Sequence, residues 1–137
     1  MAGHSHDDIS IPDSEDLYRR IARDWLVPNE VLGGCRLSSA AFKDRNKEIS
    51  VHLSSLINPE DTMAKGGVNI IGLVAVTAGE ARGLDQAVVR DPQPDDAAHA
   101  LICGTQSRSI VRRLTNMAKW IRYPDDEVWT NIATAPR

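Results

Sequence analysis

The run Val68–Val76 is the most apolar stretch of the chain, and it places the strongest constraint on the fold. It is rich in β-branched residues and too short to cross a bilayer. Both faces of an extended strand here would be largely apolar, so we predict a central strand covered on both sides. Gly72 interrupts the run. A glycine inside a strand marks a bulge or a close approach by another group.

The residues that follow predict the middle of the same sheet. Thr77–Gly83 fits a short helix that opens with a capping box between Thr and Glu and stops at glycine. Ala87–Arg90 is predicted to be a second strand and Ala98–Cys103 a third. A short helix capped by Asp95 or Asp96 is the alternative for the last of these.

The segment 14–27 fits two structures. Leu17, Ile21 and Trp25 would share one face of a helix that is capped by Ser14. Leu17–Ile21 also alternates like a strand, which would leave a short helical turn after it. We predict the helix and keep the strand as the alternative.

A hairpin is predicted between 36–42 and 49–54, because a polar, turn-forming segment separates two strand-like runs. In a symmetric register Ser39 would face His52 across this hairpin. Asn58 then predicts a helix start, with proline at the first helical position and acidic residues in the first turn. That helix should end by Gly66-Gly67.

The segment Ser107–Tyr123 is predicted to be one long amphipathic helix, stopped by Pro124. Its apolar stripe runs from Ile110 to Ile121, and Arg108, Arg112, Lys119 and Arg122 form a basic face. Together these elements predict an α+β fold: a small mixed or antiparallel sheet of about five strands with a long C-terminal amphipathic helix. We expect a disordered lead over 1–13, a single domain over 14–124 and a tail over 125–137.

Composition excludes several classes of protein. The chain has 137 residues and a formal net charge of −3, so it has no global attraction to nucleic acid or to an anionic membrane. No signal peptide or membrane-spanning run is visible, and two cysteines are too few for a disulfide framework. We therefore expect a cytoplasmic protein with no membrane contact.

The lead 1–13 has one feature with chemical content. After removal of Met1, the terminus Ala2-Gly3-His4 has the donor groups of a square-planar Cu(II) or Ni(II) site. A solvated tail or a cloning remnant is the simpler interpretation. We expect no metal and no cofactor in the folded domain.

Three residues are candidates for catalysis. Ser39 opposite His52 would place a nucleophile beside a base, although no orienting acid or oxyanion hole is evident. His99 lies in the acid-, imidazole- and thiol-containing stretch 95–103 and is a candidate acid–base group. The simpler interpretations are a polar sheet surface for Ser39 and His52 and a partly buried, hydrogen-bonded imidazole for His99.

Two sets of residues could bind an anion. Arg90 and the capped turn at Thr77 would hold an anionic, nucleotide-like substrate for His99. Arg108 and Arg112 on the last helix could contact a phosphate backbone, which makes nucleic-acid binding a further alternative. An ordinary solvated face is the simpler interpretation of that stripe.

Leu17-Tyr18-Arg19, followed by Ser38-Ser39, resembles the Arg and Ser-Thr-Ser elements of ADP-ribosyltransferases. That family also uses a late glutamate in a Glu/Gln-x-Glu turn, which this sequence does not supply. The resemblance covers five residues and does not assign the chain to that family.

The leading hypothesis is an interaction protein that presents its last helix and tail to a protein partner or to its own copy. Trp120 and Trp129 are the expected interface anchors, since tryptophan and arginine are favoured there. A small enzyme with His99 as its acid–base group is the first alternative.

Overall fold

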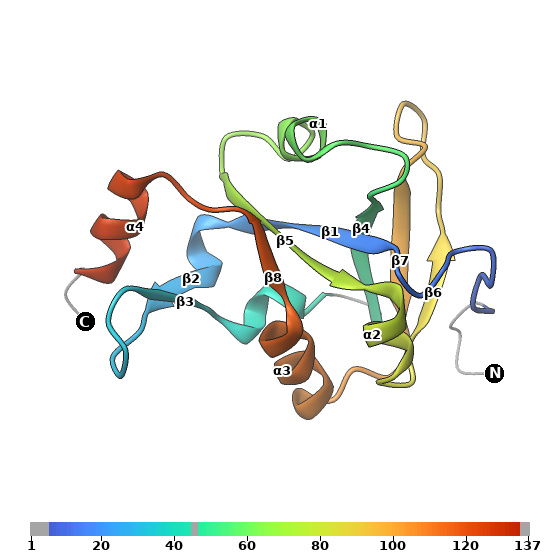
Figure 1. The fold of residues 1–137 in the computed structure, drawn as a ribbon, viewed down its shortest axis with the longest axis horizontal. Coiled ribbons are helices and arrows are strands. Elements are labelled where there is room, and N and C mark those ends of the chain that lie inside the picture. Colours follow the sequence, from blue (N-terminus) through green and yellow to red (C-terminus); the bar gives the residue numbers. More distant parts are fainter. Residues whose placement is uncertain (1–5, 45–46, 135–137) are drawn as a thin grey trace.

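The computed structural model describes residues 6–44 and 47–134. Within these residues an antiparallel six-stranded sheet has the order β6-β7-β4-β1-β5-β8, and β2 and β3 form a separate pair. Figure 1 shows α1 on one side of the large sheet and α2 and α3 on the other. The elements in chain order are β1 (Asp16–Ala22), η1 (Arg23–Trp25, a 3-10 turn), β2 (Leu26–Pro28), β3 (Cys35–Leu37), η2 (Ser39–Phe42, also 3-10), β4 (Glu48–Leu53), α1 (Pro59–Ala64), β5 (Ile70–Thr77), α2 (Ala78–Arg82), β6 (Ala87–Arg90), β7 (His99–Cys103), α3 (Arg108–Met117), β8 (Lys119–Arg122) and α4 (Asp126–Ala133).

The predicted α+β class and the apolar central strand are confirmed. β5 pairs with β1 on one side and β8 on the other, and its residues from Gly72 to Val76 are buried. Gly72 is a point of close approach, because a Cβ there would lie 2.9 Å from the Trp120 ring and 3.0 Å from the Arg122 carbonyl oxygen. The strands β6 and β7 and the capping box of α2 also form as predicted.

The helix predicted for 14–27 is wrong. Residues Asp16–Ala22 form β1, and only Arg23–Trp25 turn into a short 3-10 helix. Leu17, Arg19 and Ile21 point to the main core, whereas Tyr18 and Arg20 lie on the other face. Pairing with both β4 and β5 satisfies the backbone groups of β1, and this long-range gain outweighs a local helical preference.

The predicted hairpin between 36–42 and 49–54 is also wrong. β4 forms, but its partners are β1 and β7, while Cys35–Leu37 pairs with β2. Ser39–Phe42 winds into η2, with the Ser38 hydroxyl accepting from the Ala40 amide. This turn buries Phe42 completely, so the phenyl ring packs in the core although Phe42 does not belong to a strand.

The long C-terminal helix is not observed. α3 ends at Met117, and Ala118 already has an extended backbone. Lys119–Arg122 forms β8 on the edge of β5, so Trp120 and Ile121 belong to a strand. An exposed strand edge leaves backbone donors and acceptors unpaired, and β8 satisfies those of β5.

Residues 6–13 belong to the folded body, which corrects the prediction of a disordered lead for that part. Ile11 is buried in the main core, and the Asp8 amide donates to the Val88 carbonyl oxygen over 2.8 Å. Arg82 binds both Asp7 and Asp13. The proposed Ala2-Gly3-His4 metal site lies outside the described residues.

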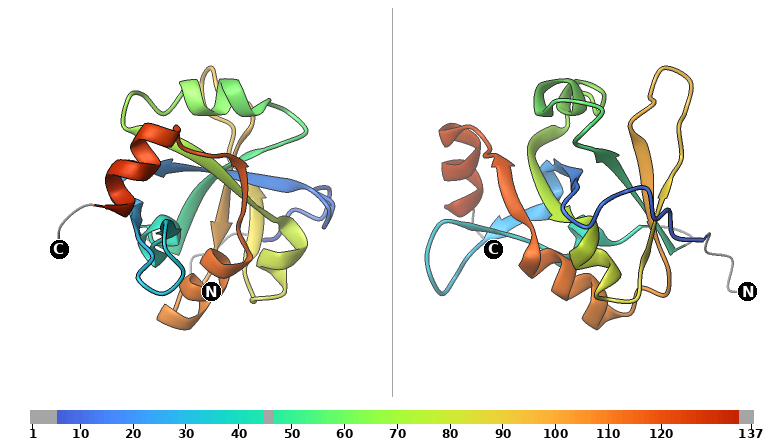
Figure 2. Two further views of the ribbon diagram at one scale, coloured as in Figure 1. Left: turned by 60° about the vertical axis from the view of Figure 1, so that its left-hand side comes forward. Right: turned by 45° about the vertical axis from the view of Figure 1, so that its right-hand side comes forward.

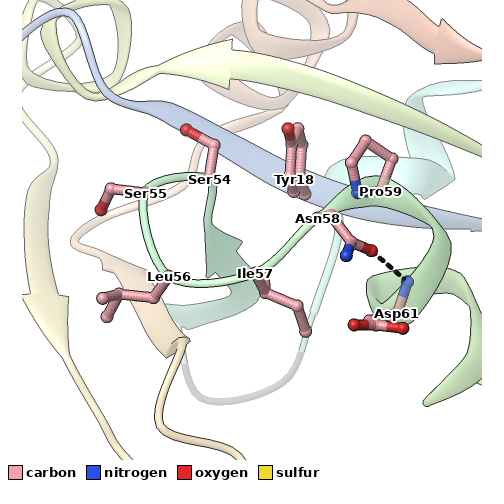
Figure 3. Close-up of a pocket in the computed structure, with 8 residues that line it drawn as sticks. All are labelled: Tyr18, Ser54, Ser55, Leu56, Ile57, Asn58, Pro59 and Asp61. Atoms are coloured by element: carbon pink, nitrogen blue, oxygen red, sulfur yellow. Dashed lines mark hydrogen bonds between the residues drawn. The ribbon is translucent and has the colours of Figure 1, made fainter.

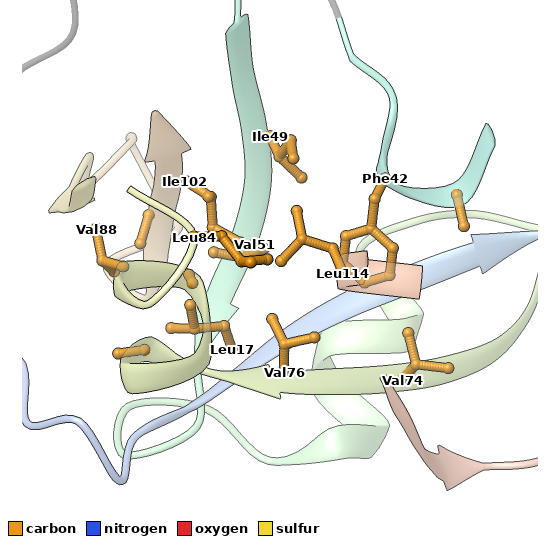
Figure 4. Close-up of a cluster of buried hydrophobic side chains, with 14 of the residues drawn as sticks. Leu17, Phe42, Ile49, Val51, Val74, Val76, Leu84, Val88, Ile102 and Leu114 are labelled. Carbon is orange, nitrogen blue, oxygen red and sulfur yellow. The ribbon is translucent and has the colours of Figure 1, made fainter. Parts of the chain in front are cut away.

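The main core fills the space between the sheet and α2, α3 and η2. Figure 4 shows Phe42 and Leu114 meeting the side chains of β4 and β5 there. On the opposite face, Ala87, Val89, Leu101 and Cys103 form a smaller apolar cluster. Polar side chains continue that face toward α1.

Cys35 and Cys103 are buried and form no disulfide. Within the described part of the chain, no helix has both the length and the apolar character to cross a membrane.

Candidate functional site

Three side chains lie abreast on the α1 side of the sheet: Tyr18 on β1, His52 on β4 and His99 on β7. The strand register pairs His52 with Tyr18 on one side and with His99 on the other. We call these residues the histidine row. The ring centroids of His52 and His99 are 6.0 Å apart, in an edge-to-face arrangement.

Each histidine of the row contacts an aspartate from the loop between β6 and β7. His52 Nε2 lies 2.8 Å from Asp96 Oδ2, and His99 Nδ1 lies 3.0 Å from Asp91 Oδ2. Lys65 at the end of α1 also reaches this loop, donating to the Asp95 carbonyl oxygen over 2.7 Å. The loop is therefore held against the sheet by contacts from β4, β7 and α1.

Burial controls the charge of His52, which is only 2% exposed. Burial lowers the pKa of His52, and the hydrogen bond to Asp96 opposes that shift without cancelling it. His52 is therefore neutral at neutral pH. Burial acts to raise the pKa of Asp96, but the contacts with His52 together with the nearby Lys65 and His99 outweigh burial, lower the pKa and keep this carboxyl ionised. The pair is a neutral imidazole bound to a carboxylate.

Asp96 has unused binding capacity. Among the described residues, its Oδ1 atom is buried and has no hydrogen-bond partner. Buried polar atoms are usually paired, so an orphan carboxylate oxygen beside an imidazole is an unusual feature that suggests a functional role. A gap of about 10 Å³, the size of one water molecule, lies beside the two histidines. The residues around it include Tyr18, Arg20, Ser50, His52 and His99.

Tyr18 also forms a wall of a larger, open hollow of about 500 Å³. Figure 3 shows the segment Ser54–Asp61 curving around this hollow, with Asn58 accepting a hydrogen bond from the Asp61 amide. Burial raises the pKa of Tyr18, so its hydroxyl stays protonated over the physiological range. A ligand in the hollow would contact the tyrosine at the end of the histidine row.

The structure separates the residues that were predicted to act together. Arg90 pairs with Ala100, on the main-core face, and binds Asp8, whereas the neighbouring His99 points to the α1 face. Thr77 uses its hydroxyl in the capping box. His99, Arg90 and Thr77 therefore do not share a pocket. Ser39 is not opposite His52, because η2 replaces the predicted strand.

The resemblance to ADP-ribosyltransferases gains no support from Arg19. Its guanidinium is buried, donates to the carbonyl oxygens of Ala41 and Ser50, and stacks over the Trp25 ring. Arg19 therefore ties η2 and β4 to β1 inside the fold.

Ser39, Arg108 and Arg112 meet at a second pocket, which we call the basic pocket. It has a volume of about 380 Å³, and its lining residues are Ser39, Lys43, Gln106, Arg108, Val111 and Arg112. The other two cations of the predicted basic face are used elsewhere, because Lys119 binds Asp16 and Arg122 binds Glu60. The sequence pattern identified Arg108 and Arg112 but missed Lys43, which lies beyond η2.

Trp120, Tyr123 and Trp129 gather at the C-terminal end of the molecule, which we call the aromatic end. The rings of Trp120 and Tyr123 stack with their centroids 5.4 Å apart, and Trp129 contacts both rings edge-on. Figure 2 shows α4 beside the β2–β3 hairpin. There the Trp129 ring lies against Gly34, where an added Cβ would be 3.3 Å from it.

No protein-family model, curated protein or solved structure matches the chain. Among residues 6–44 and 47–134, no group of three or more His, Cys, Asp or Glu side chains is placed to hold a metal ion. Asp96 and Tyr18 were not predicted as site residues. The only signal for Asp96 was its position three residues before His99, and for Tyr18 it was the alternating pattern of 17–21.

Proposed function

We propose that the protein is an interaction protein that binds a second copy of itself through the aromatic end. The supporting observation is that α4 carries Val128, Trp129 and Ile132 but buries none of its residues. Helices that complete a single domain usually bury their apolar stripe. A helix that leaves its stripe partly uncovered is suited to contact another surface.

Exposed apolar side chains at the same end support the proposal. Tyr123 is 68% exposed, and Leu32 at the tip of the β2–β3 hairpin is 84% exposed, next to exposed Val31. Large apolar side chains grouped on one surface are typical of protein contact sites, and tyrosine and tryptophan are common anchors in them. A symmetric dimer would cover the apolar side chains of α4 and the exposed Tyr123, Leu32 and Val31 at the same time.

The native mass of the purified chain tests this proposal. Light scattering should give about twice the 15.0 kDa mass of one chain. Leu32→Asp should shift the mass toward the monomer without unfolding the protein, because the leucine packs little against its own chain and a charge would be buried in the contact.

Ile9→Asp is the matched control. Ile9 is 91% exposed and follows Asp8, which binds β6 at the opposite edge of the large sheet from β8 and Trp120, and it receives the same apolar-to-acidic change. Its mass should equal that of the unchanged protein. A monomeric unchanged protein at every concentration, or equal dissociation of both variants, contradicts self-association.

A second candidate function is acid–base chemistry at the histidine row. The orphan oxygen of Asp96 and the neutral His52 favour it, because an imidazole oriented by a carboxylate is a common general base. The gap beside these histidines matches one water molecule, so hydrolysis of a ligand held in the Ser54–Asp61 hollow is the simplest reaction. His99, predicted as the acid–base group, would assist from the neighbouring strand.

Hydrolysis of a panel of phosphate and carboxylate esters tests this second candidate. Any turnover should fall by about 100-fold or more in His52→Gln. A loss of about 100-fold is the lower end of the range expected when a general base is removed. His6→Gln, at an exposed position outside the row, should leave it unchanged. Turnover that survives in folded His52→Gln protein, or a panel without turnover, counts against this function.

A further inference from the structure

The basic pocket lies on the main-core side of the sheet, where α3 packs against η2. Arg108 and Arg112 are four residues apart on α3, so their side chains project from the same face of the helix. Lys43 follows η2, and Ser39 begins it. Val111 forms the apolar part of the lining. Two separate segments of the chain thus place cations around one concavity.

The charge of this pocket is not balanced by its surroundings. Among the residues that the structure describes, its lining contains three cations and no carboxylate. None of Lys43, Arg108 and Arg112 forms an ion pair with a residue that the structure describes, whereas Arg82, Arg90 and Arg122 each bind an acid. In a chain with a net charge of −3, unpaired cations concentrated in one pocket are suited to an anion.

The donor set favours a phosphate group. Arginine offers a planar fork that fits two phosphate oxygens, and lysine adds a compact positive charge. Arg108 is the first residue of the ten-residue helix α3, where the helix dipole also attracts negative charge, and Arg112 lies one turn further on. The Ser107 hydroxyl is occupied, because it accepts from the Ile110 amide as the helix cap. Among the described lining residues, Ser39 provides a hydroxyl that can bind the anion.

We propose that the basic pocket binds the phosphate or diphosphate group of a small phosphorylated molecule. A volume of about 380 Å³ lies within the range of small-molecule sites. A nucleic-acid strand fits less well, because none of the described lining residues has an aromatic ring on which a base could stack. This inference is independent of the self-association proposed for the aromatic end, since neither Trp120, Tyr123 nor Trp129 lines the pocket.

Calorimetric titration with inorganic pyrophosphate tests the inference, with Arg112→Gln as the variant. The unchanged protein should bind one pyrophosphate per chain, and Arg112→Gln should weaken binding roughly tenfold or more, because a charge-assisted contact is lost. Arg108→Gln should behave in the same way. Both side chains are exposed, so thermal unfolding should confirm that the variants remain folded.

Arg113→Gln is the control for general electrostatics. It removes the same charge from the neighbouring position of α3, but Arg113 does not line the pocket. Its effect on pyrophosphate affinity should be about twofold or less, because solvent screens distant exposed charges. Equal weakening in Arg112→Gln and Arg113→Gln would show diffuse attraction and overturn the proposal.

Two other results would also overturn it. One is the absence of saturable pyrophosphate binding at millimolar concentrations. The other is tighter binding of a single-stranded oligonucleotide than of pyrophosphate, with a steep dependence on salt, because that behaviour belongs to a surface that follows a polymer backbone.

Discussion

Replacing Arg19 with methionine should lower the free energy of unfolding by about 3 kcal/mol, although methionine keeps the apolar stem of the side chain. The guanidinium donates to the Ala41 carbonyl oxygen at 2.8 Å and to the Ser50 carbonyl oxygen at 2.9 Å. Both acceptors would lose their donor inside the fold, and leaving a buried acceptor unpaired costs about 1–3 kcal/mol. Burial already lowers the pKa of Arg19, so part of the loss is offset by removing a buried charge.

Arg20→Met is the matched control for this prediction. Arg20 is the next residue on β1 but lies on the α1 face, only half buried, with a donor contact of 3.3 Å to the Thr62 carbonyl oxygen. Its replacement should cost about 1 kcal/mol or less. Urea unfolding followed by tryptophan fluorescence measures both variants. Equal losses would show that Arg19 is not the tether between β1, β4 and η2.

Replacing His52 with leucine should cost about 2–3 kcal/mol at pH 7. The change leaves the Asp96 carboxylate without its imidazole partner, and its Oδ1 atom already has none among the described residues. Removing one partner of a buried pair is strongly destabilising, and the partial exposure of Asp96 moderates the cost here.

The double variant His52→Leu with Asp96→Leu is the control for that mechanism. It should recover part of the lost stability, because the unpaired carboxylate is removed as well. A double variant that loses the sum of the two single effects would show that the two side chains act independently.

The pH dependence of stability provides a second measurement of the same pair. Burial lowers the pKa of His52 in the folded protein, so between its unfolded value of about 6.5 and its lower folded value the unfolded chain binds more protons. The free energy of unfolding should therefore be fully retained above about pH 6.5 and fall as the pH decreases below that value, by at most about 1.4 kcal/mol per pH unit. His52→Leu should remove this contribution. The lowered pKa values of Asp8 and Asp96 change the free energy of unfolding only below about pH 4, so they do not overlap with the contribution of His52.

The two stability predictions concern opposite faces of β1 and of its neighbour β4. Arg19 holds the main-core face together, where η2 also supplies Ser39 to the basic pocket. His52 holds the β6–β7 loop on the other face, where its cross-strand neighbour Tyr18 lines the hollow of Figure 3. The two candidate ligand sites are therefore on separate sides of the sheet. This explains why the combination of His99 with Arg90, expected from the sequence, does not occur.

Local sequence determined the elements whose stabilising contacts lie within a few residues. The Thr77–Glu80 capping box, the Asn58 cap and the strands β5, β6 and β7 form as predicted, because capping bonds and apolar runs act at short range. The same reasoning found Arg108 and Arg112 together, since residues four apart on a helix share a face.

Only the tertiary structure decided which strand lies beside which and where α3 ends. A strand pattern such as Ile49, Val51 and Leu53 specifies the buried face but not the partner, so β4 pairs with β1 and β7 instead of residues 36–42. Likewise, the open edge of β5 draws Lys119–Arg122 out of the predicted helix. These choices depend on backbone groups far apart in the sequence, and they placed Asp96 beside His52 and Lys43 beside Arg108.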